Sequence, residues 1–151
     1  MIVIVIIGVV YTLVIIKLDN TKKETSLASL STLKEYLQSF DKKREVELRC
    51  KEECHECSIY VDKQKYEDVD SFFDTTIERY RYRYTEGITQ FREDDICFRF
   101  KVDAQGVADQ ILIFYNEKVY DYSSYFDGVK VYDSLNEAQQ AKDKMVEKVL
   151  Q

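Results

Sequence analysis

The sequence predicts an α+β fold, with helices toward both ends of the chain and short antiparallel strands between them. Residues 25–40 repeat apolar side chains at steps of three and four, which is the period of an amphipathic helix. Several later segments alternate apolar and polar residues, as strands buried on one face do. With 151 residues, the chain is long enough for one hydrophobic core and one globular domain.

The N-terminal segment, residues 1–16, contains no charged side chain. A helix of this length rises about 24 Å, whereas the hydrocarbon core of a bilayer is about 30 Å thick. The segment is apolar on all sides, which suits lipid better than one face of a small core. It therefore predicts a transmembrane helix that is a few residues short of a full crossing.

The first ten residues, MIVIVIIGVV, closely resemble the N-terminal helix of type IV pilins and of the pseudopilins of type II secretion systems. The match begins at the seventh position of the family's mature helix and keeps a glycine in register at Gly8. The resemblance implies that Met1 is an internal methionine, preceded by a basic leader, a cleavage junction and a glutamate two residues upstream. Six added residues would lengthen the apolar helix to about 33 Å, enough to cross the bilayer.

The resemblance implies a pilin-like architecture, in which a long N-terminal helix packs on a small antiparallel sheet and a second helix ends the chain. It implies a structural subunit of a type IV pilus-like or type II secretion filament, as a minor pilin or pseudopilin. The expected partners are other pilin or pseudopilin subunits, the inner-membrane assembly machinery and the lipid bilayer. The expected location is the inner membrane, with a single pass and a periplasmic globular domain, or an extracytoplasmic filament. The residues expected in the membrane and in the filament core are Met1, Ile4, Ile7, Gly8, Tyr11 and Ile15.

The predicted domain boundary lies near residue 42. Residues 1–42 form the N-terminal helix, transmembrane over 1–16 and amphipathic over 25–40, and residues 43–151 form the globular domain. The apolar stripe of the amphipathic part consists of Leu27, Leu30, Leu33, Leu37 and Phe40. Such a stripe needs a partner surface, which the strands of the globular domain provide.

Alternation and turn residues predict the remaining elements. Residues 68–71 predict the start of a helix that carries Phe72, Phe73 and Ile77. Ser134 and Glu137 form a capping box, which predicts a C-terminal helix through Leu150. The expected strands are residues 46–50, 57–61, 96–102 and 128–132, with a hairpin that joins 110–115 to 118–122 around Asn116 and Glu117.

The cysteines carry the most chemistry in the sequence, at positions Cys50, Cys54, Cys57 and Cys97. A zinc site is one interpretation, with Cys97 or His55 completing a set of three thiolates. If the domain lies outside the cytoplasm, as the resemblance implies, two disulfides are favoured. Four cysteines allow three connectivities, and all three stay open. Cys50 ends one predicted strand and Cys57 begins the next, so we prefer a Cys50–Cys57 pair across a hairpin with Cys54 bonded to Cys97. We therefore favour two disulfides and expect no metal or cofactor.

The segment RYRYRY, residues 79–84, would place three tyrosines on one face of a strand and three arginines on the other. Aromatic and basic side chains can together bind single-stranded nucleic acid, but here the two kinds lie on opposite faces. The favoured interpretation is an amphipathic strand with its tyrosines toward the core and its arginines solvated or paired with carboxylates. The net charge of −6 also disfavours a general nucleic-acid surface.

A catalytic set is not visible in the sequence. The single histidine, His55, lies between Cys54 and Cys57, and a glycine-rich phosphate loop does not occur. The acidic run from Glu93 to Asp95 could bind Ca²⁺, but a solvated turn is the favoured interpretation. We therefore predict a protein that is not an enzyme. The alternative to a filament subunit is a signal-anchored periplasmic domain, held by disulfides, that binds a ligand and does not polymerise.

Overall fold

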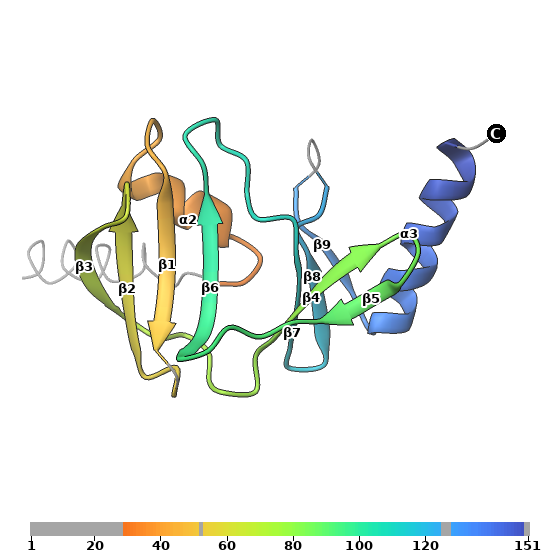
Figure 1. Cartoon of the computed structure of the whole chain (residues 1–151), viewed down its shortest axis with the longest axis horizontal. Helices are drawn as coiled ribbons and strands as arrows, with labels where there is room; N and C mark the ends of the chain where they lie inside the picture. The colour runs from red at the N-terminus through yellow and green to blue at the C-terminus, as the bar shows by residue number, and fades with distance from the viewer. Residues whose placement is uncertain (1–28, 52, 125–127, 150–151) are drawn as a thin grey trace, which may run out of the picture.

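The computed structural model describes residues 29–51, 53–124 and 128–149. These residues form two antiparallel sheets, with nine strands in total, and two helices (Figure 1). In chain order the elements are α2 (Leu33–Phe40), β1 (Val46–Lys51), β2 (Glu56–Val61), β3 (Gln64–Asp70), β4 (Glu78–Arg83), β5 (Gly87–Gln90), β6 (Ile96–Val102), β7 (Leu112–Tyr115), β8 (Lys118–Asp121), β9 (Lys130–Tyr132) and α3 (Leu135–Val149).

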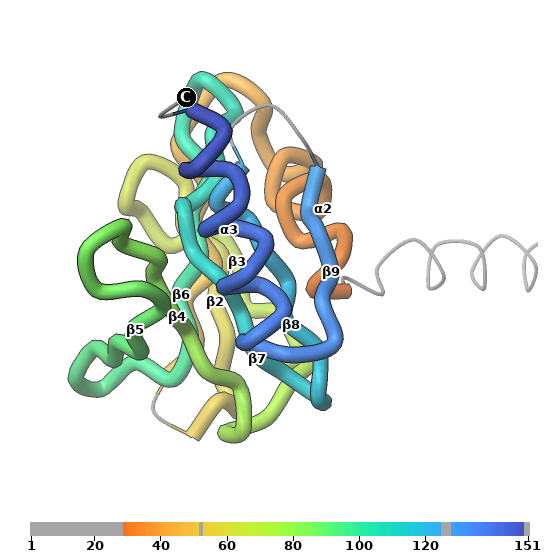
Figure 2. Tube along the Cα trace, turned by 90° about the vertical axis from the view of Figure 1, so that its right-hand side faces the viewer, coloured from red at the N-terminus to blue at the C-terminus, as the bar shows by residue number. Residues whose placement is uncertain are grey.

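The two sheets lie side by side. The first has the strand order β3-β2-β1-β6, and the second has the order β5-β4-β7-β8-β9. In Figure 1, β6 is the strand of the first sheet nearest to the second sheet. Helix α2 packs on β1 and β6, while α3 contacts β5, β8 and β9. Figure 2 shows α3 in front of the second sheet, on the side away from the first.

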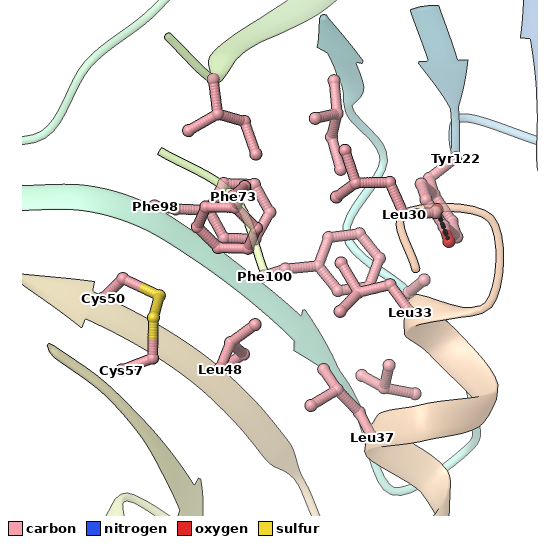
Figure 3. Packing of buried hydrophobic residues seen from close by; sticks show 14 of the residues in the cluster. Leu30, Leu33, Leu37, Leu48, Cys50, Cys57, Phe73, Phe98, Phe100 and Tyr122 are labelled. Carbon is pink, nitrogen blue, oxygen red and sulfur yellow. Dashed lines mark hydrogen bonds between the residues drawn. A yellow bond between two sulfur atoms is a disulfide. The ribbon is translucent and has the colours of Figure 1, made fainter. Parts of the chain in front are cut away.

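The main hydrophobic core lies between the first sheet and α2 (Figure 3). Leu33 and Leu37 of α2 are fully buried, as are Phe98 and Phe100 on the facing side of β6. Tyr122, just after β8, joins the second sheet to this core. Its ring lies 4.7 Å from that of Phe100, and its hydroxyl donates a 2.6 Å hydrogen bond to the carbonyl of Leu30.

The predicted fold class, a long N-terminal helix packed on one small sheet, is wrong. The described chain is mostly β, with two sheets, and residues 29–32, which were expected to be helical, precede helix α2, which begins at Leu33. The N–H of Thr32 donates to the carbonyl of Ser29 at 3.0 Å, and the N–H of Ser29 donates to Thr32 Oγ1 at 3.3 Å. Serine and threonine side chains that bond nearby backbone in this way compete with the helix. Residues 25–28 lie outside the described residues.

The helix predicted from residues 68–71 is also absent from the described chain. Residues 68–70 end β3, and a series of turns leads from there to β4. The carboxylate of Asp74 accepts the N–H and the hydroxyl of Thr76, which fixes a local turn instead of a helical one. Phe73 and Ile77 are nevertheless buried in the main core. The prediction had the right apolar residues but the wrong local structure.

The predicted single-pass inner-membrane location is corrected as well. Within residues 29–51, 53–124 and 128–149, no helix is long and apolar enough to span a bilayer. The segment that carried the prediction, residues 1–16 with Met1, Ile4, Ile7, Gly8, Tyr11 and Ile15, lies outside the described residues.

The turn and capping predictions are confirmed. β7 and β8 form a hairpin around Asn116 and Glu117, whose φ angles of 49° and 59° fit a tight two-residue turn. At the start of α3, the N–H of Glu137 donates to Ser134 Oγ at 3.2 Å. The Glu137 carboxylate accepts the N–H of Asp133 at 2.8 Å, one residue before the Ser134 N–H that a capping box uses. The end of the predicted helix, Leu150, lies outside the described residues.

Two disulfides, Cys50–Cys57 and Cys54–Cys97, hold the first sheet. Cys50 and Cys57 lie directly opposite each other in the β1–β2 ladder, and Cys97 lies on β6. This is the pairing that the strand pattern favoured. Because all four cysteines are oxidised, the alternative of a zinc site built on their thiolates is not formed.

Replacing Cys54 and Cys97 with alanine should destabilise the protein more than replacing Cys50 and Cys57. The two bonds join residues separated by 43 and by 7 positions. In the chain-entropy model these loops correspond to about 4 and about 2.5 kcal/mol in the free energy of unfolding. Urea unfolding of the two double variants measures the difference, and a larger loss from the Cys50–Cys57 variant would contradict the model.

Candidate functional site

A cleft lies between β4 of the second sheet and the outer face of β6. It encloses about 230 Å³. Its walls carry four cationic side chains, from Arg79, Arg81, Arg99 and Lys101, and two carboxylates, from Glu93 and Asp109. The other lining residues are Phe91, Gln110 and Ile111. The cleft therefore has more positive than negative groups in a chain whose net charge is −6.

Alternation along β6 places two of these cations. Phe98 and Phe100 point into the core and are fully buried, so the residues between and after them point to the opposite face. Arg99 and Lys101 therefore line the cleft. The same strand supplies both the centre of the core and one wall of the cleft.

Alternation along β4 places the other two cations. Tyr80 and Tyr82 pack on the smaller core cluster beneath α3, as the sequence pattern predicts. Arg79 and Arg81 lie on the other face of the strand and line the cleft. The predicted separation of tyrosines from arginines is thus confirmed along β4, although Tyr84, which follows the strand, is exposed and not in the core. Arg79 is buried and pairs with Glu93, which is one of the two predicted outcomes for these arginines.

Arg79 is the least exposed cation of the cleft, with 5% of its side chain accessible to solvent. Its Nη1 lies 3.6 Å from Glu93 Oε1 and donates a 3.4 Å hydrogen bond to the carbonyl of Arg99. Both distances exceed those of a close charge-assisted hydrogen bond, about 2.7–2.9 Å. Burial lowers the pKa of Arg79, although a guanidinium still keeps its proton at neutral pH. Arg79 is therefore a buried cation whose described partners are loosely placed.

Arg99 connects the cleft to the charged face of the first sheet. Its guanidinium lies 3.4 Å from Glu47 and 3.4 Å from Glu93. Burial acts to lower the pKa of Arg99, but Glu47 and Glu93 outweigh it and the net direction is upward. Glu47 has a much closer partner in Arg49, at 2.6 Å. The tight ion pair thus lies outside the cleft, and the loose pairs lie inside it.

Asp109 is a carboxylate in the wall of the cleft. Burial raises its pKa above the ordinary value of 3.8, and the hydrogen bond from the N–H of Lys101, at 3.0 Å, partly offsets this. The backbone of Asp109 also donates to the carbonyl of Lys101, so the residue is fixed against the edge of β6. Lys101 and Arg99 also act to lower its pKa, whereas Glu47 raises it.

Phe91 gives the cleft an aromatic surface. The guanidinium carbons of Arg79 and Arg81 lie 4.9 and 4.7 Å from the centre of its ring. These distances fit cation–π contacts, which favour a guanidinium over an aromatic face. Basic and aromatic groups therefore do share one surface here, although the aromatic residue is not one of the tyrosines of residues 79–84.

The cysteines and the histidine singled out in the sequence lie outside the lining of the cleft. Cys97 borders a neighbouring cavity of about 410 Å³, and His55 and Cys57 border a separate one of about 440 Å³ on β2 and β3. Glu93, from the acidic run considered for Ca²⁺, is instead paired with Arg79 and Arg99. Within the described part of the chain, no group of histidine, cysteine, aspartate and glutamate side chains is placed to hold a metal ion.

A serine, a lysine and an aspartate also meet under α3. The ammonium of Lys142 lies 2.6 Å from Asp121 Oδ2 and donates to Ser123 Oγ, while that hydroxyl donates to Asp121 Oδ1 at 2.6 Å. All three side chains are taken up by one another, because Asp121 pairs with Lys142 and also accepts the hydroxyl of Ser123. We therefore assign these three residues to holding α3 on β8 rather than to catalysis.

Sequence reasoning missed the cleft because its residues come from distant parts of the chain. Arg79 and Arg99 are 20 positions apart and belong to different sheets. The sequence did contain a signal, because arginine and lysine occupy every second position in the segments RYRYR and FRFK. Only the aromatic residues between them were used to predict what each strand packs against. No family model, curated protein or solved structure matches the chain, so the candidate site rests on its own geometry.

Replacing Lys142 with methionine should lower the free energy of unfolding by about 3–5 kcal/mol, because it leaves the buried Asp121 carboxylate without its cation. Lys144→Met is the matched control, since Lys144 is exposed on the same helix. That variant should change stability by less than about 0.5 kcal/mol. Urea unfolding checks both, and equal effects would show that the ion pair does not hold α3.

Replacing Asp109 with asparagine should change how stability depends on pH. Because the folded pKa of Asp109 is raised, its favourable contribution is full below pH 3.8 and is lost as pH rises through the folded pKa. The stability of the wild type relative to Asp109→Asn should therefore fall as pH rises above 3.8. Unfolding free energies of both proteins at increasing pH test the sign, and a rising difference would contradict it.

Proposed function

We propose that the described domain is a disulfide-bonded binding domain that recognises an anionic ligand in the cleft between β4 and β6. The observation that carries the proposal is the placement of Arg79, a cation with 5% exposure whose described anionic partner, Glu93, lies 3.6 Å away. Arg99 supports the proposal from the opposite wall, since both of its carboxylate partners lie at 3.4 Å.

The energetics of a buried cation support this proposal. Removing a charge from water costs several kcal/mol unless close partners replace the lost hydration. The long contacts of Arg79 replace it incompletely, and an incoming carboxylate or phosphate could form close hydrogen bonds with the planar guanidinium. An anion between β4 and β6 would therefore bind more tightly, because the fold has already removed these cationic side chains from water.

The disulfides support binding by holding one wall of the cleft in place. Cys97 lies on β6, two residues before Arg99, and is bonded to Cys54 in the β1–β2 connection. Arg99 and Lys101 thus project from a strand that is covalently tied to its sheet. A binding group on a fixed strand loses less freedom when the ligand arrives, which favours affinity.

The filament-subunit function stays a prediction. It depends on the resemblance of residues 1–10 to pilins and pseudopilins, and these residues lie outside the described part of the chain. The described fold differs from the predicted pilin-like architecture, so the cleft is the better supported basis for a function.

Replacing Arg81 with glutamine should weaken anion binding. Arg81 lines the cleft but is exposed, so its loss should leave the fold intact. The loss of one charge-assisted contact at an exposed position is worth about 1 kcal/mol, or about fivefold in Kd. Isothermal titration of the full chain with inorganic phosphate and with succinate, at constant ionic strength, measures the change.

The matched control is Arg83→Gln. Arg83 lies two residues along the same face of β4, but it pairs with Glu86 at 3.0 Å and does not line the cleft. Arg83→Gln removes the same charge as Arg81→Gln, so a general electrostatic effect would weaken anion binding equally in the two variants. Equal losses, or no binding of either anion to the wild type, would rule out the cleft as an anion site.

A further inference from the structure

We propose that the ligand class of this cleft is a small organic carboxylate with a short apolar body, either a free acid or the C-terminal end of a peptide. The inference rests on the proposed function, because it assumes that the cleft binds an anion. The carboxylate would face Arg79 and Arg99, and the apolar body would contact Phe91 and Ile111.

The charges of the cleft favour a carboxylate over a phosphate or a polyanion. A guanidinium can pair with either group through two parallel hydrogen bonds. A carboxylate uses both of its oxygens in such a pair, whereas a phosphate keeps further charged oxygens on the side away from the guanidinium. In this cleft the remaining walls include the carboxylates of Glu93 and Asp109, which repel additional negative charge.

The nonpolar part of the lining favours an organic ligand over an inorganic ion. The ring of Phe91 is half-buried in the lining and contacts Arg79 and Arg81. Ile111 also lines the cleft, but it is buried in the main core, so the exposed apolar surface comes from Phe91. A ligand with an apolar body would remove this surface from water, whereas phosphate and acetate have little to place against it.

The size of the cleft limits the ligand. Its volume of about 230 Å³ corresponds to roughly seven or eight waters, at about 30 Å³ each. Typical drug-sized ligands occupy pockets of about 300–1,000 Å³, so this cleft fits a smaller molecule or one end of a longer one. The adjoining cavity of about 410 Å³ shares Arg79, Phe91 and Glu93 with the cleft. A peptide whose terminal carboxylate lay in the cleft could therefore extend into this neighbouring space.

The test compares anions that differ in one property at a time. The full chain is titrated at constant ionic strength with acetate, phenylacetate and inorganic phosphate, and then with a short peptide ending in phenylalanine, in free-acid and amidated forms. Phenylacetate should bind about tenfold more tightly than acetate and than phosphate, because it adds apolar contact to the same charge. Arg81→Gln should weaken phenylacetate binding, and Arg83→Gln should not.

The outcomes separate this inference from the proposed function. If phosphate binds as tightly as phenylacetate and depends on Arg81, the carboxylate inference is wrong and the anion site stands. If none of the anions binds, or if the Arg81 and Arg83 substitutions have equal effects, both proposals are wrong.

The peptide results distinguish the two sources of the carboxylate. Tighter binding of the free-acid peptide than of phenylacetate assigns the carboxylate to a chain terminus. Equal binding of the free and amidated peptides excludes a chain terminus and leaves the free acid as the ligand source, provided that phenylacetate binds.

Discussion

The two-sided character of β6 is the constraint on which the rest of the structure depends. One face of this strand fills the core with Phe98 and Phe100, and the other carries Arg99 and Lys101 into the cleft. A shift of one residue in register would exchange the two faces, burying two cations in the core. The disulfide from Cys97 to Cys54 ties the start of the strand to the β1–β2 connection and so opposes that shift.

Two of the described contacts between the sheets are of opposite character. On one side, Tyr122 packs on Phe100 and donates a hydrogen bond to Leu30, in an apolar setting. On the other side, Arg79 reaches across the cleft to the carbonyl of Arg99. The apolar contact supplies stability, because hydrophobic burial is the dominant favourable term in folding. The polar contact contributes less, because its distances are long, and it leaves charge available in the cleft.

The parts of the fold that were predictable are those set by local chemistry. Asn116 and Glu117 mark a hairpin turn, Ser134 and Glu137 mark a helix start, and alternation marks most strands. The sequence did not separate a helix from turns at residues 68–77, since serine and aspartate suit both a helix cap and a local turn. The second sheet and the cleft were not predictable, because they depend on which distant strands become neighbours. The pattern predicted that Arg79 is either solvated or paired with a carboxylate, but it could not predict the burial of Arg79, because alternation gives the face of a strand and not the element that covers it.

Ligand binding in the cleft would couple to the contact between the sheets. Arg79 belongs to β4 of the second sheet and Arg99 to β6 of the first, and both disulfides lie within the first sheet and its connections. Among the described residues, the sheets are therefore linked by backbone connections and noncovalent contacts and not by a disulfide. An anion held by both arginines would add a further link between the sheets, and by linkage it would stabilise their observed arrangement in proportion to its affinity. The long ion pair between Arg79 and Glu93 thus leaves Arg79 open to a ligand, and a ligand held by Arg79 and Arg99 would stabilise the relative position of the two sheets.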